Sequence, residues 1–267
     1  MNGRLLLQTL RWQRTRLLIV ILAAFGWGML GPVFYTAFSD VVGQLAQSGP
    51  LMERLTNFGS GSLFNLPDAF TLGMQHPLAL AMVGVFAVGA TSTAVAGERQ
   101  RGTLEILLAR PISRVGLYAS IAVALMVPVL LVMSAIMGGF ALSAALLGVA
   151  DELEPAQMPL VVLNGFLLWA AFATFGLAAS VTFDRAAPAI ALSLAYLIVN
   201  YFLEILGSLW TEVAWSQEYS LFHHFQPGDI LRGDAAPLDF VIVGLAALIP
   251  VVYAVIVFPR RDLAAPA

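Results

Sequence analysis

The sequence contains no cysteine and no lysine, and charged residues make up only 11% of its 267 positions. Without cysteine, the chain can build neither a disulfide framework nor a thiolate site for metal or redox chemistry. Without lysine, it offers no amine for Schiff-base catalysis, and all 13 basic residues are arginines. The sequence therefore excludes thiol and Schiff-base mechanisms.

Hydrophobic residues, in contrast, make up 60% of the chain, and the mean hydropathy is +0.87. Soluble domains contain about 45–50% apolar and about 25% charged residues, so this composition indicates an integral membrane protein. A membrane-crossing helix needs about 20 apolar residues to traverse roughly 30 Å of hydrocarbon. Lipid cannot satisfy free backbone groups, so each such stretch must be helical. We predict an all-α fold with six spans: Leu17–Phe38, Leu78–Ala96, Val115–Leu142, Met158–Phe183, Ala186–Leu203 and Phe240–Phe258.

The third span lies in an uncharged run, Val115–Val149, that is too long for one straight crossing and too short for two. We predict one helix that continues past Leu142 into the outer interface, with kinks at Pro128 and at the pair Gly138-Gly139. The chain is expected to form one transmembrane domain, residues 1–267. Its outer loops, 39–77 and 207–238, are too small for cores of their own, and short interfacial helices are expected there.

The arginines are distributed unequally about the predicted spans. Only Arg54 and Arg232 lie on the side opposite the amino terminus, where most of the acids lie. By the positive-inside rule, both termini are cytoplasmic, and the protein is a multi-pass component of the cell's inner (plasma) membrane.

Residues 1–16 have the pattern of an amphipathic interfacial helix. The basic residues Arg4, Arg11 and Arg14 share one arc of a helical wheel, and leucines occupy most of the other. Such a helix would lie on the bilayer, its arginines facing anionic headgroups. An ordinary basic flank with no further role fits the same residues.

The densest charge in the interior of the chain lies at Gly97–Arg114, between two uncharged runs. Gly102 permits a break, Thr103 can cap a following helix, and Pro111 can end it. This predicts a connector helix of about two turns, suited to a partner's groove, although any tight cytoplasmic turn also collects arginines. Its two faces are Leu104, Leu107 and Leu108 on one side and Glu105, Ala109 and Arg110 on the other.

The string GERQRGTLEILLARPISR at 97–114 resembles the signature of ABC-2 type transporter permeases. In that family, an E-x-x-x-G-T-L-E-x-L-L-x-x-P-x-S-R pattern links the second and third spans. The stretch SLFHHFQP at 220–227 is similar to the aromatic, histidine and proline segment that precedes the family's last span. Six spans, an amphipathic start and a long first outer loop fit the same pattern, so the resemblance covers the whole chain.

This resemblance implies a permease subunit that is not itself an enzyme. The chain has no G-x-x-x-x-G-K-[ST] phosphate loop, so ATP and Mg²⁺ would be bound by a partner ABC ATPase subunit, and the chain itself would need no cofactor. A second permease copy, identical or different, would complete the assembly, which would export a hydrophobic or amphipathic solute. The resemblance assigns coupling to the ATPase to Glu98, Arg99, Arg101, Gly102, Thr103, Leu104, Glu105, Leu108 and Arg110.

Two amides lie within the predicted spans, and one acid lies at the end of the fifth. Asn164 and Asn200 could line a path or bond across helices, the commoner use of amides in membranes. Glu204 is near an outer end, which favours a solvated interfacial carboxylate. Asp184 and Arg185 are expected to form a local pair. The adjacent His223 and His224 lack the spacing of metal ligands on one helix face, and neither a metal site nor a nucleic-acid partner is predicted.

Other classes fit the sequence less well. An intramembrane hydrolase would need opposed carboxylates or a Ser/His set within the bilayer. An ion-coupled secondary transporter would need ionisable relay residues at mid-depth, and the inverted-repeat kind would show an internal repeat. None of these features is visible in the sequence. A non-transporting scaffold or immunity protein stays open, because no residue by itself proves flux.

Overall fold

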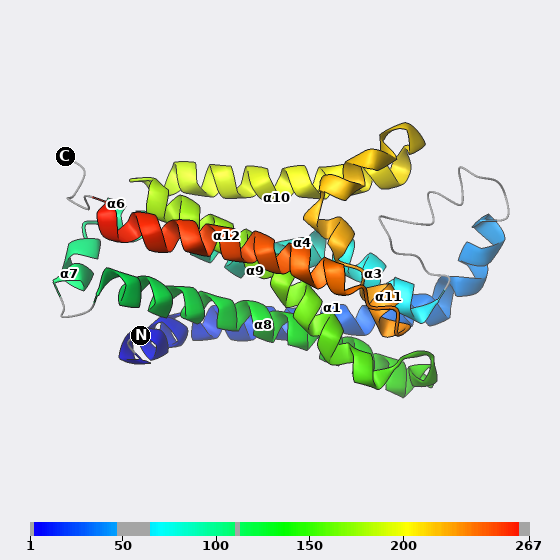
Figure 1. Cartoon of the computed structure of the whole chain (residues 1–267). Helices are drawn as coiled ribbons and strands as arrows, with labels where there is room; N and C mark the ends of the chain where they lie inside the picture. The colour runs from blue at the N-terminus through cyan, green and yellow to red at the C-terminus, as the bar shows by residue number, and fades with distance from the viewer. Residues whose placement is uncertain (1–2, 47–64, 110–112, 262–267) are drawn as a thin grey trace.

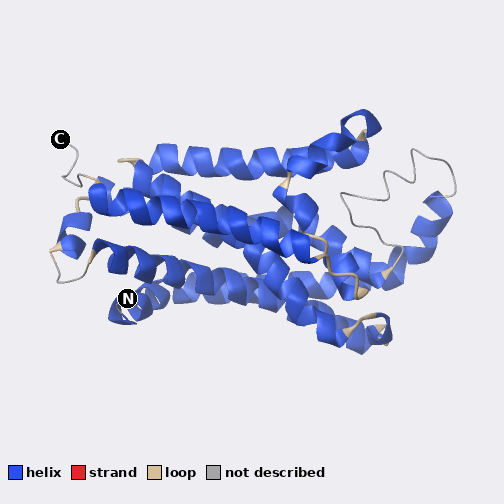
Figure 2. Cartoon of the chain, viewed as in Figure 1, coloured by secondary structure: helices blue, strands red, loops and turns tan. Residues whose placement is uncertain are grey.

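Figure 2 shows that the part of the chain described by the computed structural model, residues 3–46, 65–109 and 113–261, consists of helices joined by short turns. Within these residues, five helices are long and apolar enough to cross a membrane, and a bent pair can add a sixth crossing. The predicted all-helical, multi-span class is therefore confirmed. The long helices are α1 (Gly3–Ala46), α8 (Arg114–Leu147), α9 (Met158–Thr182), α10 (Ala186–Leu209) and α12 (Pro237–Arg260).

The predicted second span, here called the second crossing, is broken rather than straight. Helix α3 (Leu66–Gln75) and the segment from Pro77 to Thr93 meet at an angle of 61°. Pro77 starts the second piece, and the His76 side chain accepts a hydrogen bond from the amide of Leu78 at 3.2 Å. The proline lacks the amide that would continue α3, so the chain turns here. The pieces that follow are α4 (Pro77–Gly84), the π-helix η1 (Val85–Ala90) and α5 (Thr91–Thr93).

Three consecutive hydroxyl side chains satisfy carbonyl groups of the π-helix. Thr91 and Ser92 donate to Ala87 O and Val88 O, each at 2.6 Å, and Thr93 donates to Gly89 O at 3.0 Å. Such side-chain bonds replace the partners that a change of helical period removes. They make this irregular segment compatible with a membrane interior.

Helix α1 runs further than the sequence predicted, whereas α8 continues past Leu142 as predicted. Helix α1 continues without a break from Gly3 to Ala46, so residues 1–16 and the first span do not form separate helices in the described part. No glycine or proline lies between Gly3 and the predicted span to interrupt it. Helix α8 extends to Leu147 and ends at Gly148, which adopts a left-handed φ of 74°. Residues 47–64 of the predicted outer loop 39–77 lie outside the described residues.

Glycines bring α1 and α8 into backbone contact. A Cβ atom added to Gly139 would lie 2.0 Å from the carbonyl oxygen of Phe25, and one added to Gly28 would lie 2.0 Å from that of Ile136. Small residues at crossing points let membrane helices approach this closely. The pair Gly138-Gly139, predicted as a kink, thus lies inside a continuous helix, where Gly139 serves packing.

The arginine-rich segments lie together in space. In Figure 1, the start of α1, the end of α12 and the short helices α6 (Ala96–Gln100) and α7 (Leu104–Leu108) occupy one end of the bundle. The opposite end carries α3 and a group of short elements: η2 (Ala150–Glu152), η3 (Pro155–Gln157), η4 (Thr211–Tyr219), η5 (Leu221–His224) and α11 (Pro227–Leu231). This arrangement fits the predicted orientation, which stays a prediction.

Candidate functional site

The predicted connector is two short helices joined by a tight turn. Helix α6 ends at Gln100, and Gly102 adopts a left-handed φ of 71°. The amide of Gly102 donates to Arg99 O and the amide of Thr103 donates to Glu98 O, both at 3.0 Å. These two bonds define a Schellman motif, which satisfies the last carbonyls of a helix and favours glycine at the left-handed position. Helix α7 then begins at Leu104.

The Glu98 carboxylate holds this turn together. It accepts hydrogen bonds from the Arg101 guanidinium and from the Thr103 hydroxyl, which also donates to Glu98 O at 3.1 Å. The prediction that Thr103 caps the next helix is wrong for its side chain. Thr103 occupies the N-cap position of α7, but no side-chain capping bond forms there, because its hydroxyl is turned back to Glu98.

The connector is fastened to the bundle at several points. The Ser180 hydroxyl of α9 accepts hydrogen bonds from the amides of Val95 and Ala96, both at 2.9 Å. The Gln100 side chain accepts from the amide of Ala186 at 3.0 Å, where α10 begins. Leu104 is only 1% exposed and lies in an apolar cluster with residues of α8, α9 and α12. A movement of the connector is therefore coupled to the ends of several long helices.

Beside the connector, Arg99, Asp184 and Arg261 form a cluster of ion pairs, here called the ionic node. Arg99, whose side chain is 10% exposed, lies 2.9 Å from the Asp184 carboxylate in the turn between α9 and α10. The same carboxylate pairs with Arg261 at the end of α12. The predicted Asp184–Arg185 pair is therefore wrong: adjacent side chains in an extended segment point apart, and Arg185 occupies the N-cap position of α10 in an extended conformation.

Arg114 adds a further link at this end of the bundle. Its guanidinium donates to the carbonyls of Pro259 and Arg261, at 3.1 and 2.8 Å. Helix α8 begins at Arg114 and α12 ends at Arg260, so this contact joins the start of one span to the end of another. Together with the ionic node, it ties α6, α8, α9, α10 and α12 to one network.

The outward surface of the connector is exposed. Arg101, Gly102 and Glu105 are exposed, and Ile106 exposes 64% of its surface. An isoleucine so exposed at the tip of a charged segment is available to a partner's groove. Among the other predicted coupling residues, the side chain of Leu108 and the whole of Arg110 lie outside the described residues.

The basic residues of α1 divide into two groups. Arg11 and Arg14 are exposed, as expected for an amphipathic segment, and the side chain of Arg4 lies outside the described residues. Arg16 instead reaches the second crossing, where its guanidinium donates to Val85 O at 3.3 Å and its Cζ lies 5.3 Å from the centre of the Phe86 ring.

The polar residues of the spans hold the opposite end of the bundle in place. Asn164 donates to His224 O at 3.1 Å, and Asn200 accepts from the amide of Leu221 at 2.9 Å. The interpretation of Glu204 as a solvated carboxylate is wrong. Glu204 is 1% exposed, because η4 folds over the end of α10 and places the Gln217 amide 3.0 Å from its carboxylate. These residues bond elements to one another.

Several ionisable residues at this end of the bundle pair with one another. His224 Nδ1 lies 2.8 Å from the Asp239 carboxylate, and burial together with His224 lowers the pKa of the neighbouring His223. Burial alone would lower the pKa of Arg232, but its hydrogen bonds to Asp68 and Asp229 outweigh this and raise it. Arg232 thereby joins α11 to α3.

The fold and the connector define a class: a multi-pass helical membrane protein with a compact, anchored and outwardly exposed element at its arginine-rich end. A family model described as ABC-2 family transporter protein matches residues 6–263. Because this match covers nearly the whole chain, the protein belongs to that family. It is a membrane component of a transporter, has no catalytic activity of its own, and belongs to a family that in general works with an ATPase partner. A search of curated proteins found no match.

Sequence reasoning located the connector but missed several residues that fix or expose it. Asp184 could have been found, because few acids lie among the arginines predicted for this side. Ser180 and Gln100 carry no such signal, since their roles depend on which helix ends lie beside α6. Ile106 was overlooked because the leucines of α7 defined its apolar face.

Proposed function

We propose that this protein is the permease subunit of an ATP-driven exporter and that the Gly97–Arg114 connector receives the mechanical input of a separate ATPase subunit. The chain would pair with a second permease copy, identical or different, and carry a hydrophobic or amphipathic solute out of the cell. The cytoplasmic orientation of both termini belongs to the same proposal, as does the flanking role of the first turns of α1.

One observation supports this proposal: the outer surface of the connector is exposed, and its inner side is bonded to the helix bundle. Its tip presents Glu105 and the 64%-exposed Ile106. Its base holds the almost fully buried Leu104 and the Arg99–Asp184 ion pair. Force applied to the tip would pass to α9, α10 and α12 through bonds rather than dissipate in a flexible loop. An apolar knob between charges also suits a groove on a partner protein.

Replacing Ile106 with aspartate tests the docking role. Burying an isoleucine side chain contributes about 1.5–3 kcal/mol, so Ile106→Asp is expected to weaken association with the ATPase by about tenfold or more, since 1.4 kcal/mol is a factor of ten. Copurification of the cognate ATPase and the ratio of transport to ATP hydrolysis measure the effect. Leu238→Asp is the matched control, because Leu238 is 66% exposed but lies at the opposite end of the bundle. Normal copurification and coupled transport in Ile106→Asp would contradict the docking role.

The exporter function itself is tested with the two subunits together in proteoliposomes. The spans are apolar, and the buried side chains of Asn164 and Asn200 form hydrogen bonds that hold the fold. We therefore expect lipophilic amphiphiles to stimulate ATP hydrolysis and to accumulate on the outer side, whereas small hydrophilic solutes do neither. If no phosphate-loop ATPase copurifies and no such gene lies beside this one, the scaffold or immunity alternative is favoured. An ion-coupled secondary transporter would instead move solute in the presence of an ion gradient without ATP.

A further inference from the structure

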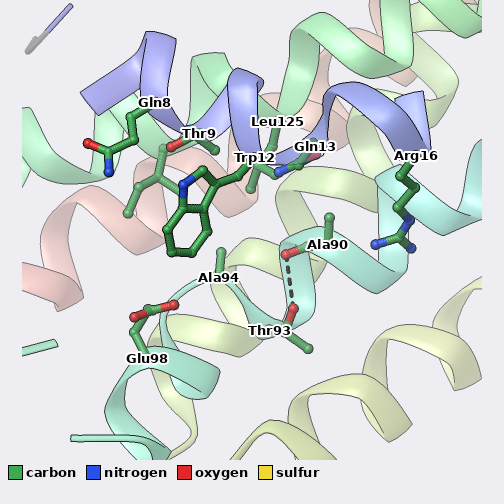
Figure 3. A pocket seen from close by; sticks show the side chains of 11 residues that line it. Gln8, Thr9, Trp12, Gln13, Arg16, Ala90, Thr93, Ala94, Glu98 and Leu125 are labelled. Atoms are coloured by element: carbon green, nitrogen blue, oxygen red, sulfur yellow. Dashed lines mark hydrogen bonds between the residues drawn. The ribbon is translucent and has the colours of Figure 1, made fainter. Parts of the chain in front are cut away.

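A pocket lies between the first turns of α1 and the second crossing, behind the connector. Its volume is about 420 Å³, within the range of about 300–1,000 Å³ that is usual for small-molecule sites. Figure 3 shows that α1 forms one wall, and that α5 and α6 form the facing wall. Its polar and aromatic lining comprises Gln8, Thr9, Trp12, Gln13, Arg16, Thr93 and Glu98.

The pocket carries opposite charges on opposite sides. In Figure 3, Arg16 lies at one side and Glu98 at the other, with the Trp12 ring on the side of Glu98. The Arg16 guanidinium is held in place by Val85 O, at 3.3 Å, and by the Phe86 ring. A guanidinium has five N–H donors, and the described residues take up one of them. The others are available to an anion such as a phosphate group.

The rest of the lining suits a cation that donates hydrogen bonds. Gln13 Oε1 is buried and has no hydrogen-bond partner among the described residues, and a buried acceptor left unpaired is costly. The Glu98 carboxylate accepts from Arg101 and Thr103, and a carboxylate has about four acceptor positions. Trp12 exposes 86% of its surface, and an aromatic face of this kind attracts an ammonium group.

We propose that this pocket binds the headgroup of an ethanolamine-type, zwitterionic phospholipid. The phosphate lies on Arg16, and the ammonium lies among Trp12, Gln13 and Glu98. A purely anionic headgroup would leave Gln13 Oε1 without a donor and would face the negative charge of Glu98. A purely cationic ligand would leave the remaining N–H donors of Arg16 without an acceptor.

The surface of α1 favours a membrane lipid over a soluble zwitterion. In the two turns after Arg16, Leu18, Ile19 and Leu22 expose 60%, 63% and 72% of their surfaces. Acyl chains that leave the pocket along α1 can cover these side chains, each methylene contributing about 0.8 kcal/mol on burial. A free headgroup would gain none of this contact.

Lipid retention by the full-length protein tests the site. The protein is reconstituted in nanodiscs that hold equal amounts of ethanolamine, choline and glycerol phospholipids, and native mass spectrometry identifies the lipids that stay bound after release. The wild-type protein is expected to retain the ethanolamine lipid in preference to the other two. Choline lacks the N–H groups that Gln13 and Glu98 require, and the glycerol headgroup lacks the cation. Soluble glycerophosphoethanolamine, added in excess, should not displace the bound lipid.

Variants test which residues hold the phosphate of the headgroup and which hold its ammonium group. Arg16→Gln is expected to reduce retention of the ethanolamine lipid by about tenfold, in keeping with one charge-assisted hydrogen-bonded contact. Glu98→Gln should reverse the preference toward the anionic glycerol lipid. Because Glu98 also holds the connector turn, Trp12→Leu provides a second variant that leaves that turn intact and should lower retention as well. Arg14→Gln, an exposed arginine on the same helix, is the matched control and should retain lipid as the wild type does.

Four results would overturn the site. The first is unchanged retention in Arg16→Gln. The second is an equal loss in Arg14→Gln, which would show general attraction to a basic flank. The third is a wild-type preference for the glycerol lipid, and the fourth is displacement of the bound lipid by the soluble headgroup. Lipid retention needs neither ATP nor a partner subunit, so its failure is distinguishable from failure of the transport role.

Discussion

Gly139→Ala is expected to destabilise the protein more than any other single methyl addition to α8. The new Cβ would lie 2.0 Å from the carbonyl oxygen of Phe25. That atom belongs to the backbone of α1, so no side chain can rotate away, and the two helices must separate. Overpacking in a close-packed interior costs about 1–3 kcal/mol and occasionally more, and we expect about 3 kcal/mol here. The thermal midpoint in detergent, followed by loss of the monodisperse gel-filtration peak, measures the change.

The neighbouring glycine is the control for this experiment. A Cβ on Gly138 would meet the Phe25 ring at 3.8 Å, an ordinary van der Waals contact. Gly138→Ala also replaces a poor helix former with a good one, so its thermal midpoint should be unchanged or higher. Equal midpoints for the two variants would show that α1 and α8 do not cross at Gly139.

Asp184→Asn is expected to have the second large effect, on stability and on coupling together. Asp184 compensates Arg99, whose side chain is 10% exposed, and Arg261, whose side chain is 23% exposed. Charge-assisted hydrogen bonds contribute about 1.5–3 kcal/mol each, but Asp184 itself is 49% exposed, and solvent screens part of this. We therefore expect a loss of about 1–3 kcal/mol in the free energy of unfolding, and a weaker link between the connector and α12.

A double-mutant cycle separates this role from a general effect of charge. Removing Arg99 as well, in Asp184→Asn with Arg99→Gln, eliminates one of the two uncompensated charges and should recover part of the lost stability. Asp151→Asn is the control, because Asp151 is exposed at the opposite end of the bundle. Strictly additive effects of the two substitutions would show that Arg99 and Asp184 are not coupled.

The sequence predicted the connector well because its signals are local. A glycine that permits a break, a helix of about two turns after it and a leucine face on that helix are properties of neighbouring residues. The structure breaks the chain at Gly102, which adopts a left-handed φ of 71°, and buries Leu104, although the helix that follows, α7, spans only Leu104–Leu108. The prediction that the Thr103 side chain caps the next helix failed because its hydroxyl had two possible partners, the amides of that helix and Glu98. Only the conformation of the turn decided between them.

Predictions about single polar side chains failed where tertiary contacts intervene. Glu204 was assigned to the solvated interface from its position in the span, but η4 folds over it. Asp184 was paired with its sequence neighbour, although the ends of α6 and α12 bring Arg99 and Arg261 to it instead. In both cases the partner is distant in sequence, and no periodicity reports such a contact.

By itself, the sequence determined that this protein is an all-helical membrane component with several apolar helices long enough to span a bilayer, and where the charged connector lies. Hydropathy, arginine distribution and the connector motif are properties of consecutive residues, so they can be read without a fold. Only the tertiary structure decided that Asp184 joins two arginines, that Gly139 lets α1 touch α8, and that Arg16 and Glu98 line one pocket. Each of these depends on distances between helices, which are set by packing of the whole bundle.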